Sequence, residues 1–207
     1  MPQPSKQFVY EVSQYLMANG LEVNFDNKLN DEIARQQSSA VFKNKILDSI
    51  ASPSLDSIIY WFLRKSVNLY GEALIKTLAL NDNKEGNTEN GVATIKRFWV
   101  KAGIDNDALN IYDGSGLSPL NRVTTHAQVA ILQYAKTRKW FPAFYDALPI
   151  YNGMKMKSGT ISDVKGFCGF HKSKSGGEYI FSFLINNYSG KTAPVVNKMY
   201  QVLDALK

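Results

Sequence analysis

Two short groups of polar residues, far apart in the sequence, could carry out chemistry together. Ser66 and Asn68 form a Ser-x-Asn triplet that offers a hydroxyl and an amide, and Lys157 opens a Lys-Ser-Gly-Thr run that offers a cation. A fixed positive charge suits recognition of a carboxylate, and a serine hydroxyl can pass a proton to a leaving group. Alone, Ser-x-Asn is also read as a helix cap and Lys-Ser-Gly as a turn, so order and surroundings decide between these interpretations.

Hydrophobic spacing predicts the elements that position the first group. Ser66 and Asn68 interrupt two apolar helical runs, which predicts a turn between helices. A polar loop is expected over 81–90 and a turn-rich loop over 113–116. The remaining expected elements are a helix from Phe8 to Leu16 ending at Asn19 and Gly20, a strand over 21–25, a helix over 54–64, a helix from Val92 to Ala102 ending at Gly103, and a helix capped by Thr124 or Thr125.

The character of the sequence changes after Gly153, where the second group lies. Three strand-like segments are expected over 154–161, 165–172 and 178–187, with a hairpin turn at 174–177 between the last two. An aromatic connection over 141–148 precedes them, and a final helix starts near Pro194. Helices followed by strands and one last helix predict an α+β fold, with an antiparallel sheet covered by helices.

The surroundings of the two groups resemble a known family. The resemblance lies in RKSVNLYGEAL (64–74), NIYDGSGLS (110–118) and MKSGTI (156–161). Together these are similar to the D-alanyl-D-alanine carboxypeptidase/endopeptidase branch of the class C penicillin-binding proteins, in which Ser-x-x-Lys, Ser-x-Asn and Lys-Thr/Ser-Gly follow in that order. The similarity runs from about Phe8 to the C-terminus. It implies a β-lactamase/transpeptidase-like fold and a serine-type carboxypeptidase acting on peptidoglycan peptides through an acyl-enzyme.

The resemblance also implies roles for the first three site residues. Lys157 would bind the terminal carboxylate of a D-Ala-D-Ala peptide or of a β-lactam, and the basic C-terminal third would reinforce that field. Ser66 would pass a proton between a catalytic lysine and the leaving amine. Asn68 would hold the acyl-amide group of the substrate through its side-chain amide. These three are the predicted catalytic residues.

Five further residues are predicted to bind substrate or shape its cleft. Ser158 would add a hydrogen bond to the carboxylate, and Gly159 would let substrate approach the strand closely. The backbone N–H of Thr160 could supply one oxyanion-hole donor. Asp113 and Ser115 are expected to be loop-forming residues near the cleft, with a structural role favoured over a catalytic one.

The departures from the family pattern limit the predicted activity. Val67 stands where the family often has Asp, which is tolerable if that side chain points away from the cleft. The nucleophile motif is the larger departure, because the single Ser-x-x-Lys, Ser162 to Lys165, follows the Lys-Ser-Gly strand instead of opening a helix upstream of Ser66. We therefore expect a chain that lacks the nucleophile and is inactive alone. The expected domain is 1–207, the C-terminal part of a transpeptidase-like domain, incomplete at its N-terminal side, with a helical region 1–150 and a sheet region 151–207.

Composition excludes several other classes of protein. The 207 residues carry a net charge of +6, and from Tyr151 onward eight lysines stand against three acidic residues, without an Arg-rich stripe or a nucleic-acid-binding motif. With one cysteine, Cys168, and two histidines, His126 and His171, neither a disulfide framework nor a Cys/His zinc site is expected. Cys168 is interpreted as a buried structural thiol and both histidines as exposed or capping residues. We expect no cofactor, no metal and no nucleic-acid partner.

Other functions and partners stay open at this point. The alternatives are a non-catalytic peptidoglycan- or peptide-binding protein of the same fold and, more distantly, a related serine esterase or β-lactamase. The resemblance implies peptidoglycan stem peptides or β-lactams as ligands, a periplasmic or extracytoplasmic location and peripheral association with the cell envelope. The start of the sequence, from Met1 to Lys6, has no apolar signal-peptide core. A sheet lacking N-terminal strands would leave an edge uncovered, which predicts homo-oligomers through that edge.

Overall fold

The computed structural model describes residues 4–23 and 49–207, and the chain divides into two compact units, 1–51 and 52–207. In the first unit, α1 (Pro4–Ala18) confirms the predicted helix, which ends in a turn at Gly20 with φ 78°. Residues 21–23 have no regular structure, so the predicted strand over 21–25 is wrong there; residues 24 and 25 lie outside the described residues. An alternating pattern becomes a strand only when a neighbour accepts its backbone hydrogen bonds, and no described strand pairs with it.

The second unit begins with helices whose first turns carry capping side chains. Ser54 caps the first of them, and Asn87 and Thr124 cap two more by accepting a backbone N–H. The elements run α3 (Leu55–Lys65), α4 (Asn68–Asn81), α5 (Thr88–Lys101), η1 (Asn106–Ala108), β1 (Leu109–Asn110), β2 (Arg122–Val123), α6 (Thr125–Lys136) and α7 (Phe141–Ala147). The predicted helices over 54–64 and after Thr124 are thus confirmed.

Two segments predicted as connections are helical in part. The polar loop expected over 81–90 is shorter, because Asn87 accepts a hydrogen bond from Asn90 N–H and starts α5. The aromatic connection expected over 141–148 is mostly α7. Phe141, Phe144 and Tyr145 have the i, i+3, i+4 spacing of one helix face, and that face packs on the sheet.

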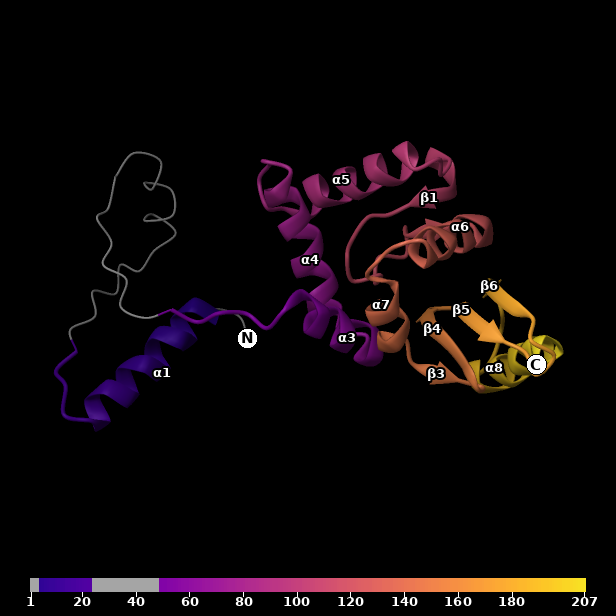
Figure 1. The fold of residues 1–207 in the computed structure, drawn as a ribbon. Helices are drawn as coiled ribbons and strands as arrows, with labels where there is room; N and C mark the ends of the chain where they lie inside the picture. The colour runs from indigo at the N-terminus through magenta and orange to yellow at the C-terminus, as the bar shows by residue number, and fades with distance from the viewer. Residues whose placement is uncertain (1–3, 24–48) are drawn as a thin grey trace. The chain divides into compact units, whose positions relative to one another are not determined.

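After α7 the chain forms an antiparallel sheet in which each strand pairs with the next strand in sequence. Its strands are β3 (Ile150–Tyr151), β4 (Met154–Ile161), β5 (Val164–Lys172) and β6 (Glu178–Ile185), in the spatial order β3-β4-β5-β6, and α8 (Thr192–Leu203) and η2 (Asp204–Leu206) complete the chain (Figure 1). A tight connection from Ser173 to Gly177 joins β5 to β6, as predicted. The three predicted strands and the final helix are confirmed, with β6 ending two residues earlier than expected.

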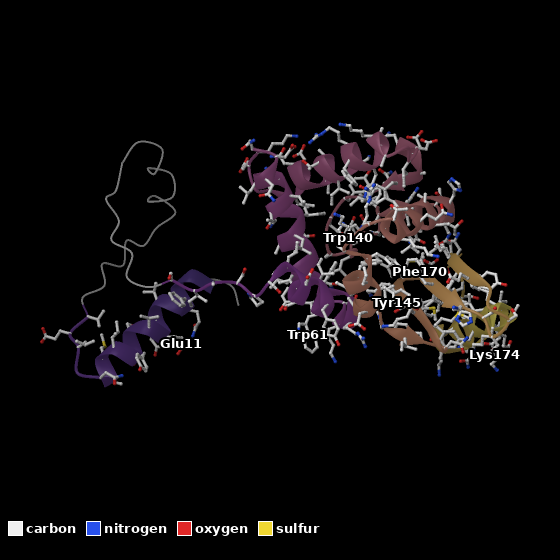
Figure 2. All side chains as sticks on the ribbon, viewed as in Figure 1. Glu11, Trp61, Trp140, Tyr145, Phe170 and Lys174 are labelled. Carbon is white, nitrogen blue, oxygen red and sulfur yellow. The ribbon has the colours of Figure 1, made fainter. Side chains whose placement is uncertain are left out.

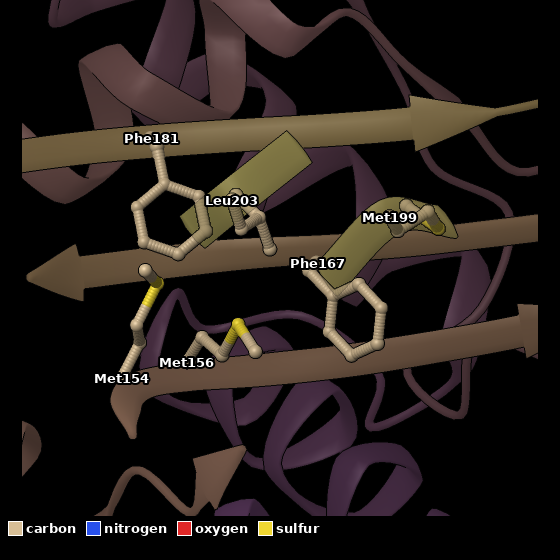
Figure 3. Close-up of a cluster of buried hydrophobic side chains, with 6 residues drawn as sticks. All are labelled: Met154, Met156, Phe167, Phe181, Met199 and Leu203. Carbon is tan, nitrogen blue, oxygen red and sulfur yellow. The ribbon is translucent and has the colours of Figure 1, made fainter. Parts of the chain in front are cut away.

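One face of the sheet is covered by α8 through a cluster of sulfur-containing, aromatic and aliphatic side chains (Figure 3). Each of these side chains contributes roughly 1.5–3 kcal/mol by leaving water. The cluster consists of Met154 and Met156 of β4, Phe167 of β5, Phe181 of β6, and Met199 and Leu203 of α8. The alternation of β4 therefore points Met154 and Met156 at α8 and leaves Lys155 and Lys157 on the opposite face.

The opposite face packs against the preceding helices. Leu132 of α6, Leu148 after α7 and Phe170 of β5 form its buried centre, and Tyr145 meets the Phe170 ring at 5.7 Å between centroids (Figure 2). Helices on both faces of an antiparallel sheet confirm the predicted α+β class. β6 pairs with β5 alone among the described strands, so the prediction of self-association through this edge stays a prediction.

Candidate active site

Ser66 lies at a sharp junction between two helices. α3 ends at Lys65, and Ser66 has φ 53° and ψ 48°, a left-handed conformation that costs an L-residue roughly 1–2 kcal/mol. Val67 is extended and Asn68 is the first residue of α4. The predicted turn is confirmed, and it places Ser66 and Asn68 together at the start of α4. The Asn68 side chain has no hydrogen-bond partner within the described ranges.

Lys157 of β4 reaches this junction across 91 residues of sequence. Its Nζ donates to Ser66 Oγ at 2.9 Å and to the Ser158 carbonyl oxygen at 2.9 Å. An ammonium group has donors and no acceptor, so Ser66 Oγ must accept, and the hydroxyl proton of Ser66 remains available to another acceptor. The structure thus brings the two separate motifs into direct contact.

The surroundings of Lys157 change its acidity. Burial lowers the pKa of Lys157 below its usual value, while Cys168, opposite it on β5, acts in the other direction when its thiol is ionised. Burial also raises the pKa of Cys168 to about 11, and Lys157 lowers it in part. A thiol with that pKa is protonated at pH 7 and unreactive, in keeping with a structural role.

The outer edge of β4 carries the remaining residues of the Lys-Ser-Gly-Thr run. Met156 N–H donates to the Pro149 carbonyl, which shows that the even-numbered peptide groups of β4 point away from β5. The N–H groups of Ser158 and Thr160 therefore face an edge that no described strand covers. A Cβ on Gly159 would meet no atom within 4 Å, so an extended ligand can approach here.

The loop from Asp113 to Ser118 is held by its own side chains. The Asp113 carboxylate accepts hydrogen bonds from Gly116 N–H at 2.6 Å and Ser118 N–H at 2.7 Å. Ser115 Oγ accepts from Leu117 N–H at 3.2 Å. Asp113 and Ser115 therefore build the loop, and within the described residues neither side chain hydrogen-bonds to Ser66 or Lys157.

Glu72 of α4 was missed by sequence reasoning, although it docks this loop beside the site. Its Oε1 accepts from Gly114 N–H at 2.8 Å and Ser115 N–H at 3.0 Å. The backbones touch where Gly71 meets Gly114, since a Cβ on Gly71 would lie 2.0 Å from the Gly114 carbonyl oxygen. Gly71 could have indicated this contact from sequence. A glycine inside a helix destabilises the helix by about 1 kcal/mol relative to Ala, so its presence there suggests a packing reason.

In the variant Asp113→Asn, the free energy of unfolding is expected to depend less on pH in the acid range than in the wild type. Burial raises the pKa of Asp113, but hydrogen bonds from Asn121, Ser118, Gly116 and Ser115 outweigh it and hold that pKa below 3.8. The ionised group therefore stabilises the fold above pH 3.8, and this contribution is lost as the pH falls through the folded pKa. In urea unfolding at several pH values, the free energy of unfolding of Asp113→Asn should fall less on acidification than that of the wild type. At pH 7 the variant should be about 1–3 kcal/mol less stable.

Asp163→Asn is the control for this prediction, because it removes an exposed carboxylate from the β4–β5 turn. Parallel pH curves for the wild type and Asp113→Asn would contradict the expectation.

The C-terminal end of α7 holds the two motifs in place. The Asp146 carbonyl accepts from Arg64 Nη2 at 2.9 Å and from Lys155 Nζ at 3.0 Å. Cations satisfy the unpaired carbonyls at a helix end and suit its dipole. Arg64 precedes Ser66 by two residues and Lys155 precedes Lys157 by two, so one helix end holds both α3, which leads into the first motif, and β4, which carries the second.

Lys155→Met is expected to lower the free energy of unfolding by about 1–3 kcal/mol, because it removes the hydrogen bonds to the Asp146 and Leu148 carbonyls and leaves Arg64 as the remaining cation at this helix end. Lys155 Nζ also donates to the Leu148 carbonyl at 3.3 Å, and its side chain is 16% exposed. Urea unfolding measures the change. Lys139→Met, at an exposed position without such contacts, should stay within about 0.5 kcal/mol of wild type. Equal losses in the two variants would refute the role of Lys155.

Other candidate residues lie apart from this site. His126 is exposed in the first turn of α6, as expected, but His171 is half-buried in β5 rather than exposed, because β5 is an inner strand. In the residues that the structure covers, no group of three metal-binding side chains occurs and no helix is long and apolar enough to cross a membrane.

The sequence matches the family described as D-Ala-D-Ala carboxypeptidase 3 (S13) over residues 1–154. The chain belongs to the S13 family. This finding confirms the resemblance inferred from the motifs. The match includes Ser66, Asn68 and the loop at Asp113, and it ends just before the strand that carries Lys157.

Known proteins similar to this S13-family chain are longer. A D-alanyl-D-alanine carboxypeptidase of Actinomadura sp. (strain R39) is 27% identical in an alignment 196 residues long, and the match covers 84% of this chain and 35% of that protein. Penicillin binding protein 4 (dacB) of Haemophilus influenzae, solved with a β-lactam, is 22% identical with a TM-score of 0.66, over 72% of this chain and 41% of that one.

A predatory endopeptidase, Bd0816 of Bdellovibrio bacteriovorus, solved with the immunity protein Bd3460, has a TM-score of 0.55 and 19% identity over 73% of this S13-family chain and 44% of the neighbour. At these identities the two solved structures show the fold alone, and they confirm the transpeptidase-like class. The chain spans about a third of the length of the curated relative.

Proposed function

We propose that this chain is the substrate-binding C-terminal part of a serine-type D-Ala-D-Ala carboxypeptidase domain and is inactive alone. In this proposal residues 1–207 belong to one transpeptidase-like domain, with a helical region 1–150 and a sheet region 151–207. The observation that carries it is the 2.9 Å hydrogen bond from Lys157 Nζ to Ser66 Oγ. That contact joins the Ser-x-Asn junction to the Lys-Ser-Gly strand. Residues of both motifs can act on one substrate only if they lie this close together.

The proposed ligand is a peptidoglycan stem peptide or a β-lactam lying along the open edge of β4. The peptide would hydrogen-bond to the outward N–H and C=O groups of Ser158 and Thr160, as an added strand does. The Asn68 amide would hold the acyl-amide group, and Lys157 would supply positive potential for the terminal carboxylate. The Thr160 N–H would donate to the oxygen that gains negative charge during acyl transfer.

Ser66 would take part in proton transfer. When a serine attacks the penultimate carbonyl, the peptide C–N bond breaks and the departing D-Ala amine needs a proton. Lys157 donates to Ser66 Oγ, which leaves the hydroxyl proton of Ser66 directed at that amine. The attacking serine and its lysine would come from a Ser-x-x-Lys helix outside these 207 residues, since Ser162 stands in the two-residue turn between β4 and β5.

The second candidate is a non-catalytic peptidoglycan- or peptide-binding protein of this fold. The position of Ser162 favours it, because this serine has φ 45° in a hairpin turn and cannot serve as the first residue of a Ser-x-x-Lys helix. Both candidates place the work outside the cytoplasm, at the cell wall. The first candidate needs a Ser-x-x-Lys segment that acts with this chain, and the second does not.

Titration of the 207-residue chain with N-acetyl-D-Ala-D-Ala tests the proposal. We expect saturable binding when the titration is monitored by NMR or calorimetry. N-acetyl-L-Ala-L-Ala should bind more weakly. Lys157→Met should weaken binding of the D-peptide about 10- to 100-fold, the effect of losing a hydrogen bond to a charged group.

Lys198→Met is the matched control, because Lys198 is an exposed lysine on α8 without a described contact. It should bind the D-peptide like the wild type. Equal binding of the D- and L-peptides, or the same loss in both lysine variants, would reject a stereospecific site at Lys157.

A further inference from the structure

Lys165 of β5 is a buried cation without an acidic partner among the described residues. Its relative exposure is 7%, its Nζ donates to Thr160 Oγ1 at 2.8 Å, and it lies 4.8 Å from the centre of the Phe167 ring. No described carboxylate lies within 4.0 Å of it. Burial of an ammonium group is costly unless something compensates for it, so the position of Lys165 calls for a reason.

Strand register places Lys165 beside the hydroxyls of the Lys-Ser-Gly-Thr run. Thr160 pairs directly with Lys165 across β4 and β5, and Ser158 pairs with Phe167. Ser158, Thr160 and Lys165 therefore share one face of the sheet, whereas Lys157 lies on the other face with Ser66. The cation nearest to the Thr160 hydroxyl is thus Lys165.

The hydrogen bond from Lys165 sets the direction of the Thr160 hydroxyl. An ammonium group cannot accept, so Thr160 Oγ1 accepts and its one proton is left for another partner. Thr160 is exposed, and Ser158 Oγ has no described hydrogen-bond partner. Two hydroxyl donors on one face of β4, one of them held by a cation, suit an anion beside this strand.

A second lysine strengthens the positive potential at this place. Burial lowers the pKa of Lys165, and the nearby charge of Lys157 lowers it further. Two lysines that repel each other without a described carboxylate between them mark a place where a bound anion would relieve the repulsion.

We infer that Lys165 is a positioning residue for recognition of a C-terminal carboxylate, acting through Thr160. Lys165 holds Thr160 Oγ1 so that its proton, together with the Ser158 hydroxyl, is donated to the carboxylate of a peptide lying along β4. This inference rests on the proposed function and adds a specificity determinant to it. Lys157 then contacts Ser66 and adds positive potential for the carboxylate, and Lys165 orients the Thr160 hydroxyl that donates to it.

The test compares N-acetyl-D-Ala-D-Ala with its C-terminal amide on the 207-residue chain. The wild type should bind the acid more tightly than the amide. Lys165→Met should weaken binding of the acid about 10-fold and change binding of the amide much less, because the uncharged amide accepts a weaker hydrogen bond than the carboxylate does. Thr160→Val should reproduce this loss, Thr160→Ser should keep the preference, and the double variant Thr160→Val, Lys165→Met should lose no more than either single variant.

The outcomes separate the inference from the proposed function. If the wild type prefers the acid and Lys165→Met keeps the same ratio of acid to amide affinity, Lys165 has no part in recognition while the proposed function stands. If the wild type binds neither ligand, the proposed function fails and the inference fails with it. Should Lys165→Met not fold, the exposed Thr160→Val decides, because an unchanged ratio in that variant overturns the inference.

Discussion

A fluorescent penicillin is expected to leave the 207-residue chain without a covalent label. Acylation by a β-lactam needs a serine whose proton is removed by a base, and general-base catalysis of this kind contributes about 10²–10⁴-fold. In the one Ser-x-x-Lys of this chain, Lys165 Nζ donates to Thr160 Oγ1, and Ser162 stands in a hairpin turn. Labelling should therefore be at least about 100-fold slower than for a carboxypeptidase with a Ser-x-x-Lys helix.

Labelled bands on a denaturing gel, with heat-denatured chain as the blank, measure this result. Ser162→Ala and Ser66→Ala are run beside the wild type. A stoichiometric adduct would overturn the inactive-alone proposal, and its loss in one of these two variants would identify the nucleophile. Reversible binding of N-acetyl-D-Ala-D-Ala without labelling is the combination that the proposal predicts.

Gly71→Ala is expected to destabilise the second unit by about 1–3 kcal/mol, the range for overpacking. The added Cβ would lie 2.0 Å from the Gly114 carbonyl oxygen and 2.8 Å from its carbon, which are backbone atoms. The loop would have to move away, which would break its hydrogen bonds to Glu72. Helix propensity alone predicts the opposite sign, a gain of about 1 kcal/mol for Ala over Gly.

Urea unfolding followed by circular dichroism distinguishes the two signs. Gly159→Ala is the control, because a Cβ there would meet no atom within 4 Å, and its stability should stay within about 0.5 kcal/mol of wild type. A Gly71→Ala chain as stable as the wild type would show that the loop is not docked on α4.

Much of the site could be predicted from sequence because it depends on side-chain types in a recognisable order. Ser66, Asn68 and Lys157 were named from two triplets, and the structure brings Ser66 and Lys157 within 2.9 Å. The junction at Ser66 was predicted since polar residues interrupt two apolar runs. The strands around Lys157 are predicted from three strand-like segments after Gly153 and from the hairpin turn between the last two.

The unpredicted parts depend on backbone atoms and on register. The acceptor that joins Arg64 to Lys155 is the carbonyl of Asp146, and a carbonyl leaves no mark in the sequence. Sequence shows Lys165 only as the last residue of a Ser-x-x-Lys match in the wrong place, and the face of the sheet that Lys165 occupies follows from its pairing with Thr160. Helix α7 was missed because a short aromatic run suits a connection as well as a helix.

The shared end of α7 also has a consequence for the order in which the chain folds. The hydrogen bonds from Lys157 to Ser66 and from Arg64 to Asp146 span 91 and 82 residues, whereas the one from Lys155 to Asp146 spans 9. Closing loops of these lengths costs about 4 kcal/mol for each long one and about 2 kcal/mol for the short one. We therefore expect local pairing of α7 with β4 to come first, and docking of α3 on α7 then to bring Ser66 to Lys157 with little further loss of chain entropy.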